Sequence, residues 1–100
     1  MCGAPDQGTL PALEVSSAEA VVHGTVRKGG DPLPGAYVRL LGSTGEFTAE
    51  VQTSASGYFR FYAADGEWTL RTLSRGADPV DTTVTAAKGE AVEATVDVPA

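Results

Sequence analysis

The 100-residue sequence contains no asparagine, one cysteine and one histidine. Without asparagine a Lys–Asn isopeptide bond cannot form in its usual way, and a single cysteine excludes an internal disulfide. The lone cysteine and histidine also lack the paired ligand spacing of a zinc site. Asp78, Asp81 and Glu90 lie near predicted loops and are weak calcium candidates, although solvated acids are the simpler interpretation. We therefore expect no metal and no cofactor.

Positive charge is also scarce, with 7 basic against 13 acidic residues and a net charge of -6. This balance disfavours nucleic acid, whose phosphates need a basic patch, and an anionic membrane surface. No hydrophobic run approaches the length of a membrane span. The opening M-C-G-A-P-D-Q-G-T-L-P-A lacks the basic and apolar regions of a secretory signal. These absences predict a cytoplasmic protein that binds neither nucleic acid nor membrane.

The length and composition indicate one globular domain with a short extension. Apolar residues make up 42% of the chain and charged residues 20%, an ordinary balance for a packed core. Residues 1–18 contain Gly3, Pro5, Gly8 and Pro11 without sustained alternation, so we predict a mobile N-terminal arm. Residues 19–100 are predicted to form a β-sandwich domain.

Period-two alternation of apolar residues, separated by Gly, Pro and Ser, predicts seven short strands. They are expected at about 20–27, 36–41, 46–53, 58–62, around Trp68 and Leu70, 80–85 and 92–98. Asp65-Gly66 is a hairpin signal. The inward positions include the four largest apolar side chains, each expected to contribute about 2–3 kcal/mol of burial free energy: Phe47, Phe59, Phe61 and Trp68.

Four spaced motifs carry a resemblance to a known fold. They are V-x-G-x-V from Val22, P-L-P-G-A-x-V-x-L from Pro32, T-x-x-x-G-x-F-x-F from Thr53 and D-G-x-W-x-L from Asp65. This pattern resembles the prealbumin-like (transthyretin-type, Ig-like) sandwiches, and within them the carboxypeptidase regulatory-like domains. The resemblance implies an all-β, seven-strand, two-sheet sandwich in which Gly57 makes a tight turn.

A narrower resemblance spans almost the whole chain. The opening M-C-G-A-P-D-Q-G, E-F-T-A-E-V at 46–51 and W-T-L-R at 68–71 resemble an SseC-like actinobacterial family of unknown function. Members of that family are associated with rhodanese-type thiosulfate sulfurtransferases. The resemblance therefore implies a role in sulfur metabolism, with such an enzyme as partner, and it implies no mechanism.

Cys2 is the only thiol and thus the only candidate sulfur acceptor. After removal of Met1 it would lie beside the α-amino group, and a nearby cation lowers the pKa of a thiol and raises its thiolate fraction. Such a cysteine can hold sulfur as a persulfide. The alternative interpretation is an inert residue in the arm.

Arginine and tyrosine recur at outward positions of the predicted strands, and both residue types are enriched at protein interfaces. If neighbouring strands bring them together, they form a candidate interaction surface: Tyr37, Arg39, Tyr58, Arg60, Tyr62 and Arg71. The alternative is that these arginines only make cross-strand ion pairs with Glu50 or Glu67.

These observations predict a non-enzymatic accessory protein that docks on a thiosulfate sulfurtransferase, with Cys2 as a possible acceptor of sulfur. The alternative is a generic protein-interaction module with no chemistry of its own. A third hypothesis, a small hydrolase that uses His23, lacks a second catalytic group at a fixed position.

Overall fold

The computed structural model describes residues 20–99, which form strands and turns without a helix. The strands are β1 (Ala20–Lys28), β2 (Asp31–Pro32), β3 (Tyr37–Leu41), β4 (Phe47–Gln52), β5 (Tyr58–Ala63), β6 (Gly66–Leu73), β7 (Val80–Ala86) and β8 (Ala91–Val98). Seven coincide with the predicted strands, and the two-residue β2 is additional. No helix that could cross a membrane occurs in this part of the chain. The predicted arm, residues 1–18, lies outside the described residues.

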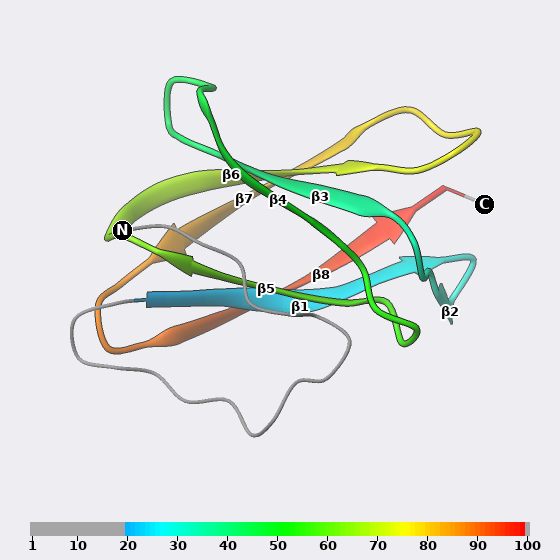
Figure 1. Ribbon diagram of the computed structural model, residues 1–100, viewed down its shortest axis with the longest axis horizontal. Helices are drawn as coiled ribbons and strands as arrows, with labels where there is room; N and C mark the ends of the chain where they lie inside the picture. The colour runs from blue at the N-terminus through cyan, green and yellow to red at the C-terminus, as the bar shows by residue number, and fades with distance from the viewer. Residues whose placement is uncertain (1–19, 100) are drawn as a thin grey trace.

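The strands form two sheets that pack as two layers (Figure 1). In the first sheet β1 pairs antiparallel with β5 and, at Arg27 and Lys28, with β2. Its pairing with β8 is parallel. The second sheet is antiparallel, in the order β4-β3-β6-β7. The predicted two-sheet β-sandwich is confirmed.

The core consists of side chains from alternate positions on the facing sides of the two sheets, as the period-two pattern requires. Phe59 and Phe61 are its largest members, both fully buried, with ring centroids 6.2 Å apart. Smaller apolar side chains of the core include Val22, Val26, Val38, Leu40, Leu70, Val84, Ala94, Val96 and Val98. Trp68 packs against this cluster partly buried, and its indole N–H donates to the carbonyl oxygen of Ala64 at 3.0 Å.

The prediction that Phe47 points inward is wrong, because its side chain is 62% exposed. A register shift between β3 and β4 is the cause: Leu40 pairs with Ala49, but Leu41 pairs with Phe47. One residue of β4 is therefore left without a partner, as in a β-bulge, and the strand's face changes there. Phe47 consequently lies beside Leu41 on the outward side of the sheet.

The hairpin expected at Asp65-Gly66 is also absent. β5 pairs with β1 in the first sheet, whereas β6 pairs with β3 and β7 in the second. The turn therefore carries the chain from one layer to the other. Its chemistry predicts a tight reversal correctly, but a reversal does not determine which strands pair.

Two glycines are required where strands approach closely. Gly57 has a φ of 76° and makes the predicted tight turn, and its carbonyl accepts a hydrogen bond from the Val26 N–H at 2.8 Å. Gly24 lies in β1 beside Ala94 of β8, where a Cβ atom would overlap the Ala94 carbonyl oxygen. Only glycine lets these two strands pair at this distance.

Thr53 fixes the loop that enters β3. Its hydroxyl donates to the Leu33 carbonyl oxygen at 2.7 Å and accepts from the Ala36 N–H at 2.9 Å. Its backbone N–H also donates to the Ala36 carbonyl oxygen at 2.8 Å. Since Thr53 is buried, these bonds are shielded from water, and they hold the Leu33–Ala36 loop against the end of the sandwich.

Candidate functional site

The structure divides the predicted arginine–tyrosine surface between two opposite faces. Tyr58, Arg60 and Tyr62 lie on β5 of the first sheet. Tyr37, Arg39 and Arg71 lie on β3 and β6 of the second sheet. The six residues therefore do not form one surface. Cys2 lies outside the described residues.

On the second sheet, four charged residues cross neighbouring strands in one row: Glu50, Arg39, Arg71 and Asp81. Arg39 Nε donates to Glu50 Oε2 at 2.7 Å, and Arg71 donates to both carboxylate oxygens of Asp81 at 2.9 and 3.0 Å. The two inner arginines are thus each paired with an outer acid. The cross-strand pairing predicted for Glu50 is confirmed, whereas Glu67 lies opposite Thr85.

The Arg71–Asp81 pair predicts a pH dependence. Hydrogen bonds from Arg71 lower the pKa of Asp81, partial burial opposes them, and the guanidinium charge adds to the lowering. Because the folded-state pKa lies below the unfolded one, the stabilisation is complete above about pH 4 and is lost as the pH falls through the folded-state pKa. Asp81→Asn should slightly lower the thermal midpoint at neutral pH, and this difference should shrink in acid. Thermal melts across the pH range, with Asp78→Asn as control, measure it; a constant difference would contradict it.

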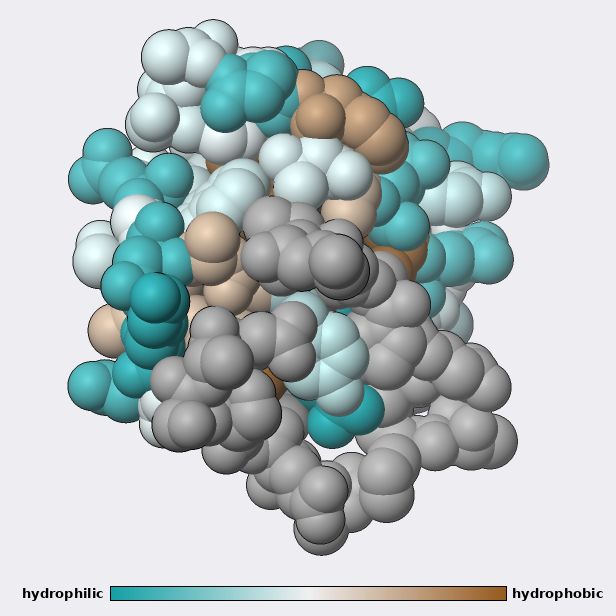
Figure 2. Space-filling model, turned by 60° about the vertical axis from the view of Figure 1, so that its left-hand side comes forward, coloured by the Kyte–Doolittle hydropathy of each residue, from teal (hydrophilic) through white to brown (hydrophobic). Residues whose placement is uncertain are grey.

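Two large hydrophobic side chains stay exposed on this same face, within the described residues: Tyr37 at 45% and Phe47 at 62%. The register places the Arg39–Glu50 pair between them, since Tyr37 lies opposite Gln52 and Phe47 opposite Leu41. We call Tyr37, Arg39, Phe47 and Glu50 the aromatic stripe. Exposed aromatics beside an arginine are the composition of an interface hot spot. Figure 2 shows the molecule from another side, where hydrophilic and hydrophobic residues are interspersed over the part that is not grey.

The outward side of the first sheet is more buried than the sequence predicts. His23 lies between Arg60 of β5 and Glu93 of β8, and its Nδ1 is 3.0 Å from the Tyr58 hydroxyl oxygen. The Arg60 guanidinium lies 5.8 Å from the centre of the Tyr62 ring, and Arg60 is only 5% exposed. Burial raises the pKa of the Tyr58 phenol, the Arg60 charge opposes this rise, and Glu93 adds to it.

This arrangement orients His23 through a polar partner, but it adds no nucleophile next to the imidazole. The tyrosine hydroxyl is held in its protonated form, which suits hydrogen bonding rather than attack. Among residues 20–99, no group of three His, Cys, Asp or Glu side chains could hold a metal ion. Asp81, one of the calcium candidates, is instead paired with Arg71.

Sequence reasoning missed a pocket of about 150 Å³ at one open end of the sandwich, where Lys28, Ser74 and Arg75 meet the Leu33–Ala36 loop. A wider hollow of about 340 Å³ adjoins it and shares Gly35, Ser74 and Arg75. A signal was present in the alternation: Lys28 continues the inward positions of β1, and Ser74 continues those of β6. Polar residues at inward positions near the end of a strand indicate that the space between the sheets is open to solvent there.

The fold and faces define an all-β sandwich of the prealbumin type with no recognisable catalytic constellation among its described residues. Residues 2–98 match a family described as "Protein of unknown function (DUF1416)", and the chain belongs to this family.

Two uncharacterized proteins of Mycobacterium tuberculosis (strain ATCC 25618 / H37Rv) are each 57% identical to the chain over 76 residues, 74% of this chain and 76% of the relative. An uncharacterized protein of Mycolicibacterium smegmatis is 52% identical over 66 residues, 65% of this chain and 73% of the relative.

Solved structures of similar shape have low sequence identity. The minor pilin GBS52 of Streptococcus agalactiae has a TM-score of 0.69 at 18% identity, covering 82% of this chain and 44% of the pilin. Catechol 1,2-dioxygenase from Pseudomonas arvilla C-1 has a TM-score of 0.63 at 14% identity, covering 97% and 58%. A DUF3823 protein from Parabacteroides merdae has 0.61 at 22%, covering 83% and 47%. The chain spans about half the length of these proteins, and the likeness shows the fold alone.

Proposed function

We propose that this chain is a non-enzymatic accessory protein of sulfur metabolism that docks on a rhodanese-type thiosulfate sulfurtransferase. The observation that carries the docking role is the aromatic stripe, which leaves Tyr37 and Phe47 exposed on either side of the Arg39–Glu50 pair. Burying these aromatic side chains against a partner removes apolar surface from water, which favours binding. The charged pair between them can fix the orientation of the partner. The class of partner rests on the resemblance of the opening and of segments 46–51 and 68–71 to the SseC-like family.

The second part of the proposal concerns Cys2. The family match begins at residue 2, so it includes this cysteine. The sulfurtransferase takes the sulfane sulfur of thiosulfate as a persulfide on its own cysteine and releases sulfite. The Cys2 thiolate then attacks the outer sulfur of that persulfide. One S–S bond breaks and another forms, which leaves the enzyme thiolate and a persulfide on Cys2.

Binding measurements with a purified thiosulfate sulfurtransferase test the docking surface. Tyr37→Ala and Phe47→Ala should each weaken binding about tenfold or more, because both remove aromatic contact area from a hot spot. Thr95→Ala, an exposed change on the opposite face, is the matched control and should bind as the unaltered protein does. Equal affinities for all four proteins would refute the stripe as the docking surface, and the absence of binding to the enzyme would refute the partner.

Mass spectrometry tests the acceptor role separately. After incubation with thiosulfate and the sulfurtransferase, the chain should gain one sulfur atom that dithiothreitol removes. Cys2→Ser should gain none while it still binds the enzyme. If the unaltered chain gains no sulfur yet binds through the aromatic stripe, the chain is a docking module with an inert Cys2.

A further inference from the structure

The end pocket combines inward-pointing polar residues from both sheets. Val22, Gly24 and Val26 point into the core from β1, so Lys28, the last residue of that strand, points in the same direction. Leu70 and Thr72 do the same from β6, and Ser74 follows them. At this end a pocket lies between the sheets, lined by Lys28, Ser74 and Arg75 together with the Leu33–Ala36 loop.

The pocket has a single sign of charge. Among the described residues, its charged lining consists of Lys28 and Arg75, without an acidic residue. Neither cation belongs to the ion pairs of the described residues, which join Arg39 to Glu50 and Arg71 to Asp81. In a protein with a net charge of -6, two cations outside these ion pairs at one concave site concentrate positive potential there.

Ser74 supplies a second, independent observation. Its hydroxyl oxygen is buried and has no hydrogen-bond partner among the described residues. A buried hydroxyl without a partner is unfavourable and uncommon in folded proteins. A small anion between Lys28 and Ser74 would accept this hydrogen bond and neutralise the ammonium charge at the same time.

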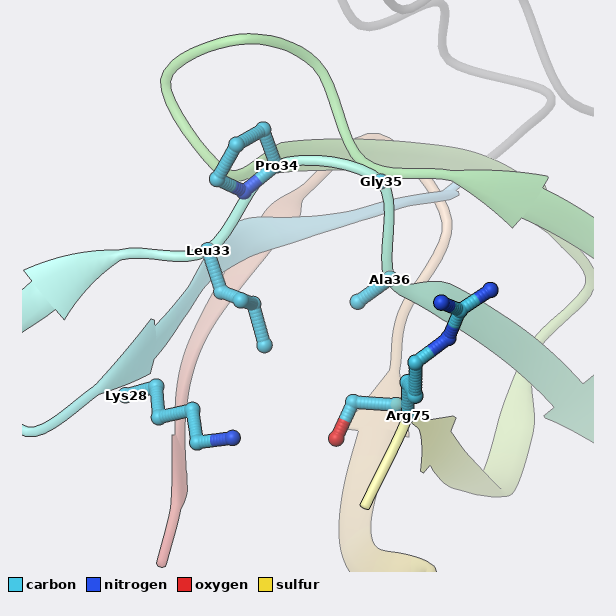
Figure 3. Close-up of a pocket in the computed structure, with 7 residues that line it drawn as sticks. Lys28, Leu33, Pro34, Gly35, Ala36 and Arg75 are labelled. Atoms are coloured by element: carbon cyan, nitrogen blue, oxygen red, sulfur yellow. The ribbon is translucent and has the colours of Figure 1, made fainter. Parts of the chain in front are cut away.

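The two cations of the pocket point in different directions. In Figure 3 the Lys28 amino group points into the space below Leu33, whereas the Arg75 guanidinium extends past Ala36, away from Lys28. Arg75 is exposed, and an exposed side chain changes rotamer within nanoseconds. Thr53 holds the opposite wall in place through its bonds to Leu33 and Ala36. One wall is therefore fixed, and Arg75 is placed to close over a ligand.

We propose that this pocket binds a small, multiply charged oxyanion of the sulfate, thiosulfate or phosphate type. Lys28 supplies the primary charge, the Ser74 hydroxyl donates a hydrogen bond, and Arg75 closes the mouth. The volume of about 150 Å³ suits such an ion with part of its hydration shell. The described residues that line this pocket include no aromatic ring on which a nucleotide base could stack, which favours the free ion. None of the residues that line the pocket belongs to the aromatic stripe, so the proposal does not depend on the docking role.

Amide NMR titrations test the site with sodium sulfate, sodium thiosulfate and sodium phosphate, each compared with sodium chloride at equal ionic strength. We expect saturable shifts at the Gly35, Ala36, Ser74 and Arg75 amides, with a dissociation constant on the order of 1 mM for at least one oxyanion. The preferred ion identifies the source, sulfur oxyanion or phosphate. Linear shifts, or shifts that chloride reproduces, would overturn the proposal.

Variants assign the residues. Lys28→Gln should weaken oxyanion binding about tenfold, the loss expected when a charge-assisted contact is removed. Lys88→Gln removes the same charge from an exposed turn and should leave binding unchanged. Arg75→Gln, at an exposed position, keeps the test valid if Lys28→Gln does not fold, and it should weaken binding several-fold. Identical affinities for Arg75→Gln, Lys88→Gln and the unaltered chain would rule out the proposed mode.

Discussion

Gly24→Ala is expected to lower the free energy of unfolding by at least about 3 kcal/mol, the upper range for overpacking in a protein interior. The added Cβ would overlap the carbonyl oxygen of Ala94, which belongs to the backbone of β8. A side chain could rotate out of the way, but a backbone carbonyl in a ladder cannot. β1 and β8 must therefore separate at this point, and the hydrogen bonds around the Gly24–Ala94 pair weaken.

Thermal unfolding followed by circular dichroism measures this effect, with an expected fall in the midpoint on the order of 10–20 °C for a domain of this size. Gly76→Ala is the matched control. Gly76 has a φ of 78°, so alanine is strained there, but apart from the two chain neighbours no heavy atom of the described residues lies within 4 Å of the new Cβ. The control should cost about 1 kcal/mol, the penalty of the left-handed conformation alone. A Gly24→Ala melt as mild as that of Gly76→Ala would show that β8 does not pair with β1 as described.

Phe61→Ala is the second change with a large expected effect, a loss of about 3–5 kcal/mol in the free energy of unfolding. Phe61 is fully buried, and its ring lies beside the equally buried Phe59. Truncation removes the apolar transfer free energy and leaves a cavity between two sheets whose backbones are fixed by hydrogen bonds. Chemical denaturation gives the free energy of unfolding. The dependence of this free energy on denaturant concentration should stay unchanged if only stability is affected.

The chain provides its own control for this prediction. Phe47→Ala removes the same atoms from a side chain that is 62% exposed, so its effect on stability should stay within about 0.5 kcal/mol. The same variant is expected to weaken docking, which separates the two roles of phenylalanine in this fold. Comparable destabilisation by Phe47→Ala and Phe61→Ala would mean that the bulge in β4 is misplaced and that Phe47 packs inward.

The alternation of apolar residues in the sequence predicts where the strands lie and, for most strands, which residues point inward. Phe59 and Phe61 are buried for the reason that predicted them, namely their parity within a strand. Phe47 shows where that reasoning fails. Parity holds only while pairing is continuous, and the shift between Leu40 and Leu41 depends on how β3 and β4 meet in space. No local pattern in residues 46–53 signals it.

The candidate surfaces were less predictable, because chain order does not give strand neighbours. Arg60 and Arg71 look equivalent in the sequence, yet they lie on different sheets, one buried against Tyr62 and the other paired with Asp81. The turn at Asp65-Gly66 separates them by crossing between layers. The inward parity of Lys28 and Ser74, by contrast, is visible in the sequence. That these two residues line one pocket follows only from the structure, in which β1 and β6 end at the same side of the sandwich.

The parallel pairing of β1 with β8 also constrains the order of events during synthesis. β1 leaves the ribosome first, but one of its two edges has no partner until residues 91–98 have followed. Contacts between segments so distant along the chain are slow to form, because a long loop must close before they stabilise anything. Until then the nascent chain presents an unpaired apolar strand edge around Val21–Val26. The domain is therefore most prone to misassembly in the interval between synthesis of the first strand and synthesis of the last.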